Sequence, residues 1–177
     1  SLRVVLREAV GSGVPTYIRI GKKGEKDLVP QAEAVGIGKT AVVRQGVDIC
    51  ILSVGTIGPE AIAAADALRG DHGVSAEVVL VNTVKPVDHE LISSLTKRFR
   101  ALLTVEEHST NGGFGEYVSA HLAQKDIHVP VVCLGTRDEF MHTVGSQSYA
   151  REYFGIDAGS IVTAAKECLS RATGSTR

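Results

Sequence analysis

The stretch VDICILSVGTIGPE, residues 47–60, decides the fold class. Its first part, residues 47–54, is a mainly apolar run of the kind found in strands that are buried on both faces of a sheet. Residues 58–60, GPE, then open a helix with proline near its first position, and this helix ends near Gly70. The turn over 55–59 lacks the Gly-x-Gly-x-x-Gly spacing and the lysine of a phosphate-binding loop, which favours a plain strand-to-helix turn. A buried strand that leads directly into a helix is the repeating unit of an α/β sheet.

The same alternation continues toward the C-terminus. We predict further buried strands over 76–81, 101–105 and 129–134. We predict helices over 88–98, 146–154 and 158–169, and one more that contains Val118 and Leu122. Toward the N-terminus, Thr40–Arg44 is predicted to be a strand. Gln45 and Gly46 are predicted to join it to the 47–54 strand in a hairpin. The pattern predicts a three-layer αβα fold with a mostly parallel five-stranded sheet and one antiparallel edge strand.

The first 36 residues follow a different pattern. Apolar residues on one helical face predict a helix over Leu2–Val10, and the alternation of Thr16–Ile20 predicts a strand. Residues 24–36 lose this periodicity and include Gly24 and Pro30, as linkers do. The chain is expected to begin inside a helix, and a helix and a strand before a linker form no domain by themselves.

Composition narrows the functional classes. The 177 residues carry 19 Lys+Arg against 20 Asp+Glu, with no dense basic block, which argues against nucleic acid as a partner. No apolar run approaches the roughly 20 residues of a membrane helix. Cys50, Cys133 and Cys168 are far apart and lie in apolar runs, so we expect reduced thiols and no metal site. We also find no leader pattern, and we therefore expect a cytoplasmic protein.

Polar residues after the predicted strands are the candidates for a site. Glu106, Glu107 and His108 are consistent with an acid/base group or with helix capping and interface hydrogen bonds, and we favour the second interpretation. Adjacent strand residues point to opposite faces, so Glu106 and Glu107 are not expected to converge on one substrate. His142 lies in a loop and is expected to be a surface or interface residue. No residue is assigned a catalytic role.

Arg19 and Lys22 lie at the end of the predicted 16–20 strand. Cations at a strand end suit a phosphate or a carboxylate, and solvated surface charge is an equally good interpretation. They are the candidates for binding such an anion.

Seven short motifs, taken in order, resemble the C-terminal end of the transketolase family of thiamine-diphosphate enzymes. The motifs are PTYIR at 15–19, SVGT at 53–56, VKPVD at 84–88, TVEEH at 104–108, GGFG at 112–115, GTRDEF at 135–140 and FGID at 154–157. Within the family the chain is most similar to the C-terminal subunit of split transketolases, and next to 1-deoxyxylulose-5-phosphate synthase.

The resemblance implies a division of the chain. Residues 1–27 would be the last helix and strand of a pyrimidine-binding domain, 28–35 a linker, 36–170 the transketolase C-terminal domain and 171–177 a flexible tail. Thiamine diphosphate and Mg²⁺ would be bound by the other domains of the full-length enzyme, with none expected in this chain. The partners would be those domains, in a homodimer.

The activity implied is transfer of a two-carbon ketol unit between sugar phosphates, with this chain alone inactive and serving domain packing. In the family a basic residue at the end of the strand that matches Thr16–Ile20 helps to hold the sugar phosphate, and Arg19 and Lys22 are its possible matches here, as substrate phosphate ligands. Two alternatives stay open: a synthase or 2-oxo acid dehydrogenase β-type subunit of the same superfamily, and a stand-alone ligand-binding or interaction module that uses the crevice at the strand ends.

Overall fold

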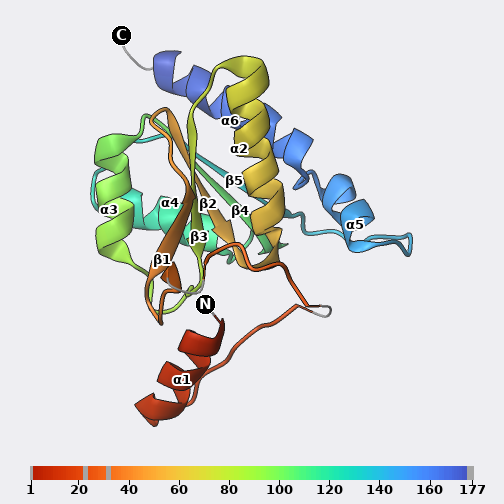
Figure 1. The fold of residues 1–177 in the computed structure, drawn as a ribbon. Coiled ribbons are helices and arrows are strands. Elements are labelled where there is room, and N and C mark those ends of the chain that lie inside the picture. The colour runs from red at the N-terminus through yellow and green to blue at the C-terminus, as the bar shows by residue number, and fades with distance from the viewer. Residues whose placement is uncertain (1, 22–23, 31–32, 175–177) are drawn as a thin grey trace.

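The computed structural model describes residues 2–21, 24–30 and 33–174 (Figure 1). The helices and strands are, in chain order, α1 (Leu2–Ser12), β1 (Thr40–Arg44), β2 (Ile49–Val54), α2 (Gly58–His72), β3 (Ala76–Val81), α3 (His89–Arg98), β4 (Leu102–Ser109), α4 (Phe114–Gln124), β5 (Val131–Thr136), α5 (Gln147–Phe154) and α6 (Ala158–Gly174). A single 3₁₀ turn, Gly55–Ile57, joins β2 to α2. No helix in the described part of the chain is long and apolar enough to cross a membrane.

The five strands form one sheet in the order β1-β3-β2-β4-β5. β1 is antiparallel to β3, and the other neighbouring strands are parallel. Alternate residues of β2 enter two separate cores: Ile49 and Ile51 pack beneath α2 and α6, while Cys50 and Leu52 pack beneath α3 and α4. Figure 1 shows the resulting three layers, with the sheet between the two helix pairs. The predicted fold class is confirmed.

The predicted hairpin between β1 and β2 is wrong. β1 pairs with β3, and β2 lies on the far side of β3. The connection crosses the start of β3, where the N–H groups of Val47 and Asp48 both donate to the Ser75 carbonyl, at 3.0 and 2.9 Å. Gly46 allows this crossing, because a Cβ atom there would collide with the backbone of Ala76. A close backbone crossing therefore separates the two strands that the Gln45-Gly46 turn was expected to pair.

Two of the predicted helices begin where expected, each at a side-chain cap. The Asp88 side chain accepts from the Leu91 N–H at 2.9 Å and caps α3, and the Ser146 hydroxyl accepts from the Tyr149 N–H at 3.1 Å and caps α5. Gly73 ends α2 in the left-handed conformation, three residues beyond the predicted end.

The N-terminal segment is the second departure from prediction. Thr16–Ile20 is not a strand, and its side chains Tyr17 and Ile20 are 89% and 67% exposed. An alternating segment needs a neighbouring strand, and none of the described strands lies beside it. α1 has no buried residue, and it is tied to the domain by the Glu8 carboxylate, which accepts from the Ile37 N–H at 2.6 Å.

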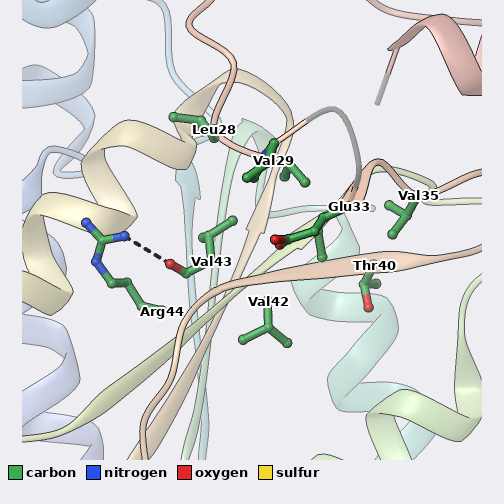
Figure 2. A pocket seen from close by; sticks show the side chains of 10 residues that line it. Leu28, Val29, Glu33, Val35, Thr40, Val42, Val43 and Arg44 are labelled. Carbon is green, nitrogen blue, oxygen red and sulfur yellow. Dashed lines mark hydrogen bonds between the residues drawn. The ribbon is translucent and has the colours of Figure 1, made fainter.

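A cleft of about 430 Å³ lies between β1 and residues that precede it in the chain, among them Leu28, Val29, Pro30, Glu33 and Val35. Figure 2 shows Leu28, Val29 and Val35 on one side of the cleft and β1 on the other. Two charged residues, Glu33 and Arg44, also line the cleft (Figure 2). The Arg44 guanidinium is paired with the Asp66 carboxylate at 2.8 Å. The cleft therefore follows the edge strand β1.

Candidate functional site

Parallel strands β2, β4 and β5 end at the same edge of the sheet, where functional residues of such folds gather. Five polar side chains meet at this carboxyl edge, from three separate parts of the chain. They are Thr56 in the turn after β2, Glu60 in the first turn of α2, Glu107 in β4, and Gln147 and Arg151 one turn apart on α5. We call these five residues the edge network.

The Glu107 carboxylate is the centre of the edge network. One oxygen accepts from Arg151 Nε at 2.8 Å and from Gln147 Nε2 at 2.9 Å, and the other accepts from the Thr56 hydroxyl. Arg151 also donates from Nη1 to the Glu60 carboxylate at 3.2 Å and from Nη2 to the Thr56 carbonyl at 3.1 Å. The Glu107 and Arg151 side chains are only 16% and 11% exposed. The network therefore fastens α5 to the ends of β2 and β4.

Electrostatics keep Glu107 ionised. Burial by itself raises the pKa of this carboxyl, but hydrogen bonds from Thr56, Arg151 and Gln147 together with the Arg151 charge outweigh burial and lower its pKa. An ionised carboxylate accepts hydrogen bonds and cannot donate a proton. At neutral pH Glu107 is thus an ion-pair partner and not a general acid.

This shift predicts acid sensitivity. The depressed pKa of folded Glu107 stabilises the fold above the pKa of a free glutamate, about 4.3, and that contribution is lost as the pH falls through the lower folded value. Chemical denaturation between pH 7 and pH 3 should show the free energy of unfolding decreasing below about pH 4.5. Glu107→Gln should make this decrease in the free energy of unfolding smaller. Glu152→Gln is the control, because it changes an exposed carboxyl on α5, the helix that carries Arg151. It should leave the decrease unchanged.

Glu106 points the other way, as predicted. It is 3% exposed, and its two oxygens accept from the backbone N–H groups of Phe114 at 3.0 Å and Gly115 at 2.9 Å. It thereby satisfies two free donors at the start of α4. The expectation that Glu106 and Glu107 do not converge is confirmed, and both carboxylates already accept hydrogen bonds from the protein itself.

The remaining candidates lie around this edge without joining one another. His108 is exposed, with Nδ1 3.0 Å from the Ser109 carbonyl oxygen, and His142 is exposed in the loop before α5. Arg19 is exposed and donates from Nη1 to the Glu107 carbonyl oxygen at 3.1 Å. Lys22 lies outside the described residues. The structure therefore brings one of the two candidate phosphate ligands, Arg19, to the edge of the sheet.

Four edge-network residues were missed from sequence: Thr56, Glu60, Gln147 and Arg151. Thr56 and Glu60 follow β2 directly, so the strand-end rule places them at the right edge. Gln147 and Arg151 are four residues apart, which puts them on one helix face, but nothing in the sequence indicates that this face meets β4.

The donor set at this edge does not fit a magnesium–diphosphate group. Within residues 2–21, 24–30 and 33–174, no three His, Cys, Asp or Glu side chains gather as metal ligands. The nearby carboxylates of Glu60, Glu106 and Glu107 accept from Arg151 or from backbone N–H groups. No catalytic step is therefore derived through thiamine diphosphate in this chain.

The three-layer fold and the edge network define a doubly wound α/β domain whose polar edge holds its own helices in place. Residues 38–161 match the family "Transketolase, C-terminal domain". The chain belongs to this family, which forms part of thiamine-diphosphate-dependent enzymes.

Named relatives agree with this assignment. The chain is 34% identical over 170 residues to the 6-deoxy-6-sulfo-D-fructose transketolase subunit SqwH of Clostridium sp. (strain MSTE9), covering 96% of this chain and 52% of the relative. It is also 34% identical over 172 residues to 1-deoxy-D-xylulose-5-phosphate synthase of Syntrophus aciditrophicus (strain SB), covering 96% of this chain and 26% of that relative. The chain thus spans about half of the first relative and about a quarter of the second.

A solved structure has the same fold. "Split gene transketolase, inactive beta4 tetramer" superposes with a TM-score of 0.87 at 30% identity, covering 95% of this chain and 54% of that one. The similarity includes the N-terminal segment as well as the sheet domain, because residues 38–161 alone make up a smaller share of the chain.

Proposed function

We propose that this chain is the C-terminal part of a transketolase-like enzyme that transfers a two-carbon ketol unit between sugar phosphates. The proposal rests on the hydrogen bonds and ion pairs of the edge network. Its charged groups bind one another and the backbone. They therefore serve packing and leave the reaction to other parts of the enzyme. The likeness to a transketolase subunit over 96% of the chain supports the reaction class.

In this proposal the other parts of the enzyme hold thiamine diphosphate and Mg²⁺, and the cofactor supplies the carbanion chemistry of ketol transfer. Those parts are also the partners of this chain, in a homodimeric enzyme of the cytoplasm. The chain spans about half of the SqwH relative, which leaves room for them elsewhere in the enzyme.

The proposed domain division follows the packing. Residues 1–27 belong to the pyrimidine-binding domain, 28–35 to a linker, 36–170 to the C-terminal domain and 171–177 to a tail. α1 has no buried residue, and Val10, Val14 and Tyr17 are 84%, 62% and 89% exposed. Apolar side chains this exposed favour a covering partner. Leu28 and Val29, by contrast, pack against the domain core, which supports a boundary near residue 28.

Arg19 is proposed to contribute to the substrate phosphate site, together with Lys22. One guanidinium nitrogen of Arg19 holds the Glu107 carbonyl, which positions the side chain at the edge. A guanidinium has five N–H donors, so this contact leaves donors for a phosphate oxygen. His108 and His142 are proposed as interface residues at the same edge.

The substrate test uses the complete enzyme, supplied with thiamine diphosphate and Mg²⁺. With xylulose 5-phosphate as donor and ribose 5-phosphate as acceptor, we expect ketol transfer. The second candidate, 1-deoxyxylulose-5-phosphate synthase, is favoured by the 34% identity to the Syntrophus enzyme, and it predicts consumption of pyruvate with glyceraldehyde 3-phosphate instead. Turnover of pyruvate without ketol transfer would contradict the first proposal.

The isolated chain gives a separate prediction. Because its edge carboxylates and Arg151 are mutually paired, we expect no saturable binding of thiamine diphosphate, and little or none of ribose 5-phosphate, in isothermal titration calorimetry. A stand-alone binding module would instead show saturable sugar phosphate or nucleotide binding that the Arg151→Ala variant alters.

A further inference from the structure

A second polar cluster lies between α3 and α4, on the face of the sheet opposite α2 and α6 (Figure 1). His89 is the first residue of α3, and Tyr117 and His121 lie one turn apart on α4. The ring centres of His89 and His121 are 4.4 Å apart, and those of His89 and Tyr117 are 5.9 Å apart. The Tyr117 hydroxyl oxygen is 3.3 Å from His89 Nε2. Three side chains with metal-binding atoms therefore converge from two helices.

These separations can be compared with those of ligands that share one metal ion. Metal–nitrogen bonds of about 2.0–2.1 Å place adjacent ligand atoms about 2.9–3.4 Å apart, and the centres of adjacent imidazoles about 4.5–5.2 Å apart. The observed 3.3 Å between Tyr117 Oη and His89 Nε2 lies inside the first range. The 4.4 Å between the imidazole centres lies just below the second.

The chemical state of the cluster also suits a metal ion. Nε2 of His121 is buried and has no hydrogen-bond partner, so a ring nitrogen is left without a role in the fold. His89 is exposed and Tyr117 is 45% exposed, so an ion and its water ligands can reach these two side chains from solvent.

We propose that His89, Tyr117 and His121 form a binding site for a divalent first-row transition-metal ion, with water completing the coordination. Imidazole nitrogens suit copper, nickel and zinc, and for a given nitrogen and oxygen site copper(II) binds most tightly of the three. The bound ion would join the first turn of α3 to α4 and so stabilise the folded chain. No metal site was expected from the widely spaced cysteines, and His89 and His121 lie 32 positions apart in the sequence.

The experiment is calorimetric titration of the full, untagged chain with CuCl₂, NiCl₂ and ZnCl₂, followed by thermal unfolding with each ion. We expect one ion per chain, tightest for copper, and a rise in Tm that depends on metal concentration. His89→Ala and His121→Ala should each weaken binding by about tenfold or more, and Tyr117→Phe should weaken it less.

His128→Ala is the matched control, since His128 is exposed and is paired with Asp126 at the far end of the α4 region. It should leave binding unchanged. Circular dichroism of each variant without metal would show that it folds. Affinity that survives in a folded His89→Ala, His121→Ala double variant, or that falls equally in His128→Ala, would overturn the site. This outcome is independent of the enzyme activity proposed above.

Discussion

Replacing Arg98 with alanine is expected to lower the free energy of unfolding by about 3 kcal/mol, because it leaves a buried charge without its partner. Glu77 in β3 is fully buried, and one of its oxygens accepts from Arg98 Nη2 at 2.7 Å. Its other oxygen has no hydrogen-bond partner. The ion pair with Arg98, at the end of α3, is therefore the main compensation for placing this carboxylate inside the domain. Urea denaturation of the two proteins measures the difference.

Two further variants identify the cause. Glu77→Met in the Arg98→Ala background removes the buried charge and should restore at least about half of the lost stability, since apolar replacements of buried ion pairs are often neutral or stabilising. Arg100→Ala is the matched control, because the Arg100–Asp48 pair is 3.7 Å long with Arg100 59% exposed, and it should cost no more than about 1 kcal/mol. Equal losses in Arg98→Ala and Arg100→Ala would show that burial of Glu77 is not the determining factor.

Gly46→Ala is expected to destabilise the fold by at least about 3 kcal/mol. The new methyl group would overlap the backbone of Ala76 and Glu77 at the start of β3. Backbone atoms inside a sheet cannot move aside as a flexible side chain can, so the crossing between β1 and β2 would have to shift. Thermal unfolding should show a much lower Tm, or an insoluble product.

Gly70→Ala is the control for the glycine change itself. Gly70 lies within α2 with open space around the position of its missing Cβ, so alanine should stabilise the chain by about 0.5–1 kcal/mol. The two substitutions are chemically identical and are predicted to act in opposite directions. A neutral Gly46→Ala variant would contradict the close crossing that separates β1 from β2.

The buried elements of the fold were predictable because their apolar runs are continuous. β3 occupies the residues that its Val-rich run indicates, and the Asp88 and Ser146 caps mark the starts of α3 and α5. The partner of β1 was not predictable. A two-residue turn is typical of a hairpin, and the close crossing at Gly46 that separates β1 from β2 is visible only in the structure. Thr16–Ile20 has strand periodicity without a neighbouring strand, and sequence alone cannot supply that neighbour.

The site was predictable only in part. The strand-end rule identified Glu107, and the alternation rule separated it from Glu106. Arg151 lies 44 positions after Glu107, and His121 lies 32 positions after His89. The first contact depends on how α5 packs on the sheet, and the second on how α3 and α4 pack on it. Local patterns give the face of a helix and not the residue it meets.

Reconstitution of ketol transfer tests the central claim most directly. The chain would be assayed with thiamine diphosphate, Mg²⁺, xylulose 5-phosphate and ribose 5-phosphate, first alone and then with the part of the enzyme that carries the pyrimidine- and diphosphate-binding domains. We predict no transfer by the chain alone and cofactor-dependent transfer when both parts are present. Cofactor-dependent turnover by the chain alone, or none from the two folded parts together, would contradict this account.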